Sequence, residues 1–215
     1  PGLMMAKDAS IPVILTDSYA EFGPQDANFP NYLAFVGPSD RDAGKQMAEA
    51  LFASLTPAAD GKKYIAAVNG TAGTSVAIDR RAGLQDALDA APDVVLVGEV
   101  DGNFVRDTSQ TVFESLWQGN PNIQGVWAAN GGTATGVMAA ISAAGKTPGT
   151  DIMVVAMDLN PENVDAVEQG TLLFDIGGHW LQGGFALTMM YDYLNGKELS
   201  AEQANVKLSL LPLTK

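Results

Sequence analysis

Six runs of apolar and β-branched residues recur along the chain, and segments with helical spacing separate most of them. Near-continuous apolar runs are typical of strands buried on both faces of a parallel sheet, and helices must cross over between such strands. The pattern therefore predicts an α/β fold with parallel sheets. The predicted strands cover residues 11–16, 64–68, 94–97, 125–128, 152–156 and 172–176.

The segments between these runs carry signals for the start and end of helices. Ser39 precedes a segment with apolar residues at four-residue spacing, and Asn160 followed by Pro161 supplies a cap and a proline at the first helical position. Asn195 and Gly196 end the last helical segment. The predicted helices cover residues 40–55, 74–91, 105–117, 133–144 and 180–194, and a further helix starts at 160–161.

Two segments depart from this alternation. Residues 17–32 are rich in Pro, Gly, Asn and Asp and have no clear periodicity, so they are expected to form a long loop before a short apolar run at 33–36. Residues 3–7 resemble the end of a helix that leads straight into the first strand. We therefore expect the chain to enter one α/β unit midway and to contain a second, complete unit from residue 64 to residue 176.

The charge balance argues against several classes of partner. Twelve Lys and Arg against 25 Asp and Glu give a net charge of −13, which repels phosphate backbones and anionic lipid surfaces. Nucleic acid is therefore not an expected partner. The chain has no cysteine, so disulfide and thiol chemistry are excluded. No apolar run is long enough to span a bilayer, and the first residues lack the layout of a signal peptide.

Small and polar residues follow the predicted strands. Ligands bind beyond the carboxyl ends of the strands in open parallel sheets, so these positions are candidates for a binding site. The alternative is a purely structural role, because Asp, Asn and Gly are favoured in turns and helix caps. Asp17 and Asp158 are harder to explain in that way, because each directly follows a buried run. The positions are Asp17, Asn69-Gly70, Asn130-Gly131, Asp158 and Gly177 to Trp180.

Two further residues are candidates because of their place in the helices. Arg80 lies on the first turns of its helix, from which a planar guanidinium can reach back over the strand ends and make paired hydrogen bonds. Phe104 precedes another helix and offers an aromatic face, although phenylalanine lies more often in the core. Trp117 and Trp127 are predicted to lie in the core.

Several segments along the chain form a wider pattern, namely 11–17, 36–40 with Ala43-Gly44, 73–75 with Arg80 and Gly83, 127–130 and 154–158. In the order and spacing of these segments the chain resembles the type I periplasmic sugar-binding proteins of ABC importers, of which the ribose- and galactose-binding proteins are the best known. The resemblance implies two three-layer α/β/α lobes with a sugar held in the cleft between them. It places Asp17, Arg80, Asn130 and Asp158 on sugar hydroxyls and Phe104 against the sugar ring.

The resemblance also sets expected lobe boundaries. Residues 1–38 and 179–207 correspond to a partial N-terminal lobe, and residues 39–178 and 208–215 correspond to the C-terminal lobe with a final strand near 208–215. Roughly the first third of the family's chain has no counterpart in these residues. Ser18, Gly131 and Gly178 stand where the family often has arginine, an acidic residue and glutamine, and the following His179 and Trp180 are expected to supply contacts instead.

The resemblance implies a periplasmic solute-binding protein whose lobes close on a sugar by hinge motion and deliver it to an ABC permease in the inner membrane. A sensory relative that serves a chemoreceptor or a receptor kinase is an alternative, as is the effector-binding core of a lactose-repressor-type regulator, which would need a helix-turn-helix headpiece. An enzyme is not expected, because the chain lacks nucleophile and phosphate-loop motifs. No cofactor and no metal are expected, since one histidine is too few for a histidine-rich metal site.

Overall fold

A computed structural model describes residues 2–215, which divide into two compact units. Of these residues, unit 1 comprises 2–39 and Gly178–Leu210, and unit 2 comprises Asp40–Gly177 and Leu211–Lys215. The boundaries predicted after residues 38, 178 and 207 lie one, one and three residues away from these limits.

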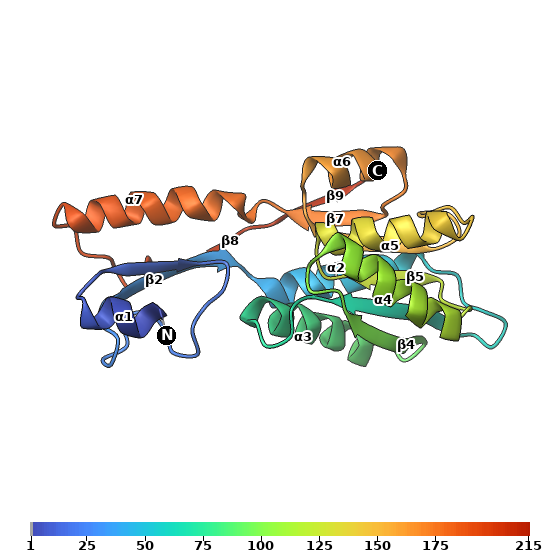
Figure 1. The fold of residues 1–215 in the computed structure, drawn as a ribbon, viewed down its shortest axis with the longest axis horizontal. Helices are drawn as coiled ribbons and strands as arrows, with labels where there is room; N and C mark the ends of the chain where they lie inside the picture. Colours follow the sequence, from blue (N-terminus) through green and yellow to red (C-terminus); the bar gives the residue numbers. More distant parts are fainter. Residues whose placement is uncertain (1) are drawn as a thin grey trace. The chain divides into compact units, whose positions relative to one another are not determined.

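Unit 2 is built on a six-stranded sheet in the order β4-β3-β5-β6-β7-β9 (Figure 1). Five strands are parallel, and β9 runs antiparallel to β7 at one edge. Helices join the successive parallel strands, as the sequence pattern predicts for an α/β unit. The strands are β3 (Lys63–Asn69), β4 (Val94–Asp101), β5 (Gly125–Ala128), β6 (Met153–Asp158), β7 (Phe174–Gly177) and β9 (Leu211–Thr214).

Helices cover both faces of this sheet. On one face α2 packs over β5, β6 and β7 and lies against α3, and on the other face α4, α5 and α6 enclose a core of small and branched residues. Gly125 and Trp127 of β5 face α2, whereas Val126 and Ala128 face the α5 side, as strand alternation requires. The helices are α2 (Asp40–Ser54), α3 (Ser75–Ala90), α4 (Arg106–Gly119), α5 (Gly131–Ala143) and α6 (Pro161–Gln169).

Unit 1 has a smaller, three-stranded parallel sheet in the order β1-β2-β8. The strands are β1 (Val13–Thr16), β2 (Tyr32–Pro38) and β8 (Asn205–Leu208). The whole of β2 is buried, and α7 packs on β1 and β2. The remaining elements are the helix α1 (Gly2–Asp8), the short 3₁₀ helix η1 (His179–Leu181) and α7 (Gln182–Leu194).

The structure corrects three details of the predicted elements. The single strand expected near residues 208–215 is two strands, because β8 ends at Leu208 in the sheet of unit 1 and β9 starts at Leu211 in the sheet of unit 2. The helix predicted from Trp180 begins as the turn η1 and becomes α-helical at Gln182. Trp127 is fully buried as predicted, but Trp117 is only half-buried and packs at the margin of the core.

The helices of residues 2–215 were expected to include no membrane-spanning segment. None of them combines the length and the apolar character that a membrane crossing requires.

Candidate functional site

The carboxyl ends of the parallel strands of unit 2 bring most of the predicted site residues to one edge of the sheet. Asn69 ends β3, Asp158 ends β6, and Ala128 ends β5 two residues before Asn130. Because the strands run parallel, these ends lie at the same edge, where ligands bind in open α/β sheets. A hydrogen bond and ring contacts direct Arg80 and Phe104 to this edge.

Arg80 is buried and joined to two groups of unit 2. Its Nε donates to Oδ1 of Asp40 at 2.7 Å, and its Nη1 donates to the carbonyl oxygen of Ala129 at 2.8 Å. Ala129 directly follows β5, so the guanidinium reaches the carboxyl end of the sheet. A guanidinium has five N–H groups in a planar fork, and these two bonds fix the plane of that fork.

The helices that carry Arg80 and Asp40 approach each other very closely. A Cβ atom on Gly44 of α2 would lie 2.1 Å from the carbonyl oxygen of Arg80, and one on Gly83 of α3 would lie 2.0 Å from that of Arg41. Glycine at both crossing points lets the two backbones touch. This packing sets the distance between the start of α2, where Asp40 lies, and the second turn of α3, where Arg80 lies.

Phe104 lies against both Gly70 and Arg80. A Cβ atom on Gly70 would come within 1.9 Å of Cζ of the Phe104 ring, so the ring occupies the space that the missing side chain leaves above the end of β3. The Arg80 Cζ atom lies 5.8 Å from the ring centroid, within the range of a cation–π contact. Phe104 has a φ of 62°, a left-handed conformation that is uncommon for an aromatic residue. Phe104 is therefore half-buried at the strand ends and does not belong to the core.

Asn130 and Asp158 meet at the start of α5. Asn130 is the N-cap of this helix, and its Oδ1 accepts from the backbone N–H of Thr133 at 2.8 Å. The Oδ2 of Asp158 accepts from the backbone N–H of Gly131 at 3.1 Å. A carboxylate at the N-terminus of a helix is favoured by the helix dipole. The cap does not use the Asn130 NH₂ group, which can donate to a ligand.

A second carboxyl group, that of Asp175, lies close to Asp158. Asp175 is fully buried in β7, and its Oδ1 and Oδ2 accept from the backbone N–H groups of Ile176 and Leu159. Burial, and after it the negative charge of Asp158, raise the pKa of the Asp175 carboxyl to about 7. The Asp175 carboxyl group therefore changes its charge near neutral pH.

The remaining predicted site residues belong to unit 1. Asp17 follows β1 with a φ of 66°, and its backbone N–H donates to the carbonyl oxygen of Val36. His179 and Trp180 lie in η1, directly after Gly178, and Trp180 is 56% exposed. The structure brings Arg80, Phe104, Asn130 and Asp158 together within unit 2, and it places Asp17, His179 and Trp180 in the other unit.

Two residues at this edge were not among the predicted site residues: Asp40 and Asp175. Asp175 could have been found, because it is a charged residue inside an otherwise apolar run and such a residue needs buried partners. Asp40 carries no such signal, since an acidic residue in the first turn is a common helix start. Its partner lies 40 residues away in sequence, a pairing that only the packing of α2 on α3 creates.

The chemistry of the edge suits an uncharged, hydroxyl-rich ligand. The buried pair of Arg80 and Asp40 has no net charge, Asn130 and Arg80 supply donors, Asp158 supplies an acceptor, and Phe104 supplies an aromatic face. Among residues 2–215, no group of three His, Asp or Glu side chains is placed to hold a metal ion.

Comparison with known proteins identifies a family that this chain matches. Residues 1–198 match the model of the family described as the periplasmic binding protein domain. The chain is 32% identical over 174 residues to the galactofuranose-binding protein YtfQ of Escherichia coli (strain K12), a match that covers 79% of this chain and 52% of that protein. It is 34% identical over 171 residues to the ribose import binding protein RbsB of Salmonella typhimurium, covering 80% of this chain and 53% of that one.

A solved structure gives the same result at the level of the fold. A protein of Mycobacterium smegmatis in complex with β-D-fucofuranose superposes with a TM-score of 0.87 and 29% sequence identity, covering 99% of this chain and 67% of that chain. The present chain spans about half the length of the curated relatives named above.

Proposed function

Because this chain belongs to the periplasmic binding protein domain family and has the type I fold of that family, we propose that it binds a neutral sugar and forms part of a solute-binding protein of an ABC importer. The predicted family and fold class are confirmed by this membership. The relatives named above are binding proteins, and no chemical turnover of the ligand is proposed.

The observation that carries the proposal is the arrangement of Arg80 and Phe104. The buried guanidinium is fixed by Asp40 and by the Ala129 carbonyl, and it lies against the face of the Phe104 ring at the strand ends. A sugar offers hydroxyl groups at its rim and apolar C–H groups on its faces. A rigid donor beside a half-buried aromatic ring is therefore suited to a ring of this kind.

We propose furanose sugars as the first ligands to test. The curated relative YtfQ is named for galactofuranose, and the solved structure from Mycobacterium smegmatis holds β-D-fucofuranose. Ribose is the second candidate, because it is named for the relative RbsB. In this proposal Asp158 accepts from sugar hydroxyls, while Asn130 and Arg80 donate to them. Asp17, His179 and Trp180 of unit 1 are proposed as further contacts.

Isothermal titration calorimetry with galactofuranose, fucofuranose and ribose tests the proposal. We expect at least one of them to bind, and Asp158→Asn to weaken that binding about 10- to 100-fold, because a hydrogen bond to a charged group is worth about 1.5–3 kcal/mol. Glu168→Gln, an exposed change of the same kind on α6, serves as the matched control and should leave binding unchanged. If Asp158→Asn and Glu168→Gln bind the sugar equally well, the site is wrongly placed.

The delivery step is part of the same proposal. The protein acts in the periplasm and passes the sugar to an ABC permease in the inner membrane. The test is growth on the sugar that binds best. It compares the wild type with a strain that lacks the gene and with a strain that carries Asp158→Asn. Equal growth of the wild type and of both strains would exclude a role in import.

A further inference from the structure

Asp175 is a buried carboxyl group that takes no part in the proposed sugar contacts. It lies in β7 with no exposed surface, at the position that pairs with Ala156 of β6. Its Oδ2 accepts from the backbone N–H of Leu159 at 3.1 Å, and its Oδ1 accepts from its own neighbour Ile176 at 2.9 Å. Burying a carboxyl group is costly, so the hydrogen bonds of Asp175 explain why this residue is retained in β7.

The bond to Leu159 holds an unusual turn. Asp158 has a φ of 137° and Leu159 a φ of 56°, so two consecutive residues with side chains adopt positive φ. Such conformations are costly and persist only where the surroundings hold them. The opposite strand leaves little room, because a Cβ atom on Gly177 would lie 2.5 Å from the Asp158 carbonyl oxygen. Asp175 thus holds the Leu159 amide. Gly177 lacks a side chain and so leaves room for the backbone of Asp158.

The direction of the Asp158 side chain depends on this turn. Its Oδ2 reaches the backbone N–H of Gly131 at the start of α5, which fixes one carboxylate oxygen toward the helix. If Asp158 returned to an ordinary φ, its carboxylate would leave that position, because the backbone sets the direction of the Cα–Cβ bond.

We propose that Asp175 is a positioning residue of the sugar site, which aims the Asp158 carboxylate by holding the Leu159 amide. This inference rests on the proposed function, since it assigns Asp158 to a sugar hydroxyl. Asp175 itself lies beneath the turn and does not touch the ligand.

The charge of Asp175 then affects the site. Hydrogen bonds to an ionised acceptor are shorter and stronger than those to a neutral one, so the ionised form holds Leu159 more tightly. Burial and the neighbouring Asp158 charge raise the pKa of Asp175 to about 7. Lowering the pH through this value protonates Asp175, loosens the turn and weakens sugar binding. Binding of sugar is therefore expected to release a proton near neutral pH.

The other groups around Asp175 leave Asp158 as the main charged neighbour. Ala156 belongs to the core beneath α5 and pairs with Asp175, so Asp175 faces that same side. On that side α5 has no charged residue in its sequence, and β9 presents Leu213 at the paired position. On α6 the charged residues are Glu162, Asp165 and Glu168, and Glu162 is paired to Arg106. On the buried side of α2 the charged residue is Asp40, which is paired to Arg80.

Amide resonances provide a test that needs no ligand. In ¹⁵N-labelled protein, the Leu159, Ile176 and Gly131 amides should titrate together with a midpoint near 7, and Asp175→Asn should abolish this titration. Asp158→Asn should lower the midpoint at Leu159, because it removes the neighbouring charge. A Gly131 amide that does not respond when Leu159 titrates would show that Asp175 does not position Asp158, and the proposal would be overturned.

Calorimetry of the best-binding sugar from pH 6 to pH 8 gives the second test. The wild type should bind more tightly at pH 8, whereas Asp175→Asn should bind about tenfold more weakly at pH 8 and lose the dependence on pH. Glu168→Gln should keep the wild-type profile. An unchanged profile in Asp175→Asn overturns the positioning role. If none of the sugars binds, the proposed function fails, and the amide titrations still decide whether Asp175 aims Asp158.

Discussion

Asp40 and Arg80 form an ion pair in which each side chain is only 3% exposed and the two charged groups lie 2.7 Å apart. The pair joins the first turn of α2 to the second turn of α3, and a further bond from Arg80 reaches the end of β5. One guanidinium thus links two helices and the sheet at the edge where the site lies. Removing either Asp40 or Arg80 leaves the other buried charge without its counter-charge.

Asp40→Ala is expected to destabilise unit 2 by about 3–5 kcal/mol, the usual cost of breaking a buried ion pair at one end. Urea unfolding followed by tryptophan fluorescence measures this loss, since Trp127 lies in the same unit. Arg41→Ala breaks the exposed pair of Arg41 and Asp86 on the same two helices and is the matched control. Equal losses in the two variants would mean that burial of the pair contributes nothing.

Gly44→Ala should separate α2 from α3. The added Cβ would lie 2.1 Å from the backbone oxygen of Arg80, which cannot turn away as a side chain can. We expect a loss of about 1–3 kcal/mol in the free energy of unfolding, as for other overpacked cores. Gly119→Ala, which has open space around the new Cβ, should cost nothing or stabilise α4 slightly. A stability for Gly44→Ala equal to that of Gly119→Ala contradicts the observed packing.

Gly70→Ala is expected to displace the Phe104 ring from the strand ends. The new Cβ would overlap the ring at 1.9 Å, and the ring is a side chain that can move. Sugar affinity should therefore fall as far as it does in Phe104→Leu, while the free energy of unfolding changes less than in Gly44→Ala. Calorimetry and urea unfolding on the same samples separate the two effects. Wild-type affinity in Gly70→Ala would place the sugar elsewhere than on this ring.

Asp175 should make the protein less stable as the pH rises. Its pKa is raised to about 7 in the folded state, well above the value of an exposed carboxyl, so between these two values the folded state binds more protons than the unfolded state. The contribution is full below the unfolded pKa and is lost as the pH approaches and passes 7. From pH 5 to pH 8 the loss is roughly 2–3 kcal/mol. In Asp175→Asn the stability difference between pH 5 and pH 8 should shrink by about this amount, and an unchanged difference would contradict a raised pKa.

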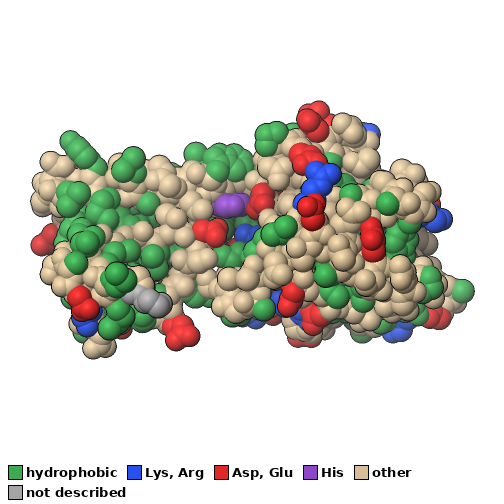
Figure 2. Space-filling model, in the orientation of Figure 1, with side chains coloured by type: hydrophobic (Ala, Val, Ile, Leu, Met, Phe, Trp, Pro, Cys, Tyr) green, Lys and Arg blue, Asp and Glu red, His purple; other side chains and the backbone are tan. Residues whose placement is uncertain are grey.

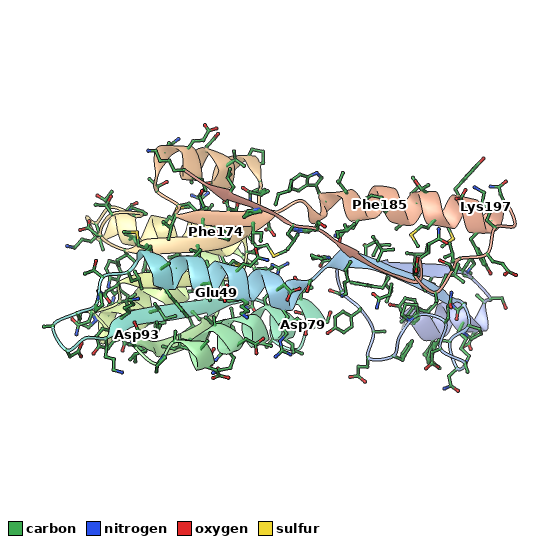
Figure 3. All side chains as sticks on the ribbon, turned by 180° about the vertical axis from the view of Figure 1, so that it is seen from behind. Glu49, Asp79, Asp93, Phe174, Phe185 and Lys197 are labelled. Carbon is green, nitrogen blue, oxygen red and sulfur yellow. The ribbon has the colours of Figure 1, made fainter. Side chains whose placement is uncertain are left out.

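Unit 1 should be cleaved before unit 2 in limited proteolysis. Hydrophobic side chains gather on its surface (Figure 2), and none of the described residues of α1 or α7 is buried. On α7, Phe185 (Figure 3) is 48% exposed, Leu187 is 72% exposed and Tyr191 is 66% exposed. A helix with so little burial opens at low cost.

Chymotrypsin digestion followed by mass spectrometry checks this order of cleavage. First cuts are expected within residues 182–194. Sites within unit 2, such as the fully buried Trp127, should be protected until much later. First cuts near Trp127 would show that unit 2 is the less stable of the two.

The order of elements could be predicted because each depends on local pattern. The run at 152–156 and the cap at Asn160 with Pro161 define β6 and the start of α6 wherever they lie in the fold. The end of the chain could not be divided in the same way, since β8 and β9 are separated by only two residues and differ in the strands they pair with. Pairing partners far away in sequence decide which sheet a short strand joins.

The sequence by itself determined the fold class, the strand-end positions of Asn130 and Asp158, and the place of Arg80 on the second turn of its helix, because periodicity and caps are local. Tertiary structure alone decided the partners of these residues. Asp40 meets Arg80 only because glycines let α2 and α3 touch, and Asp175 meets the Asp158 turn only because β7 lies beside β6. Long-range packing and burial set these contacts and raise the pKa of Asp175.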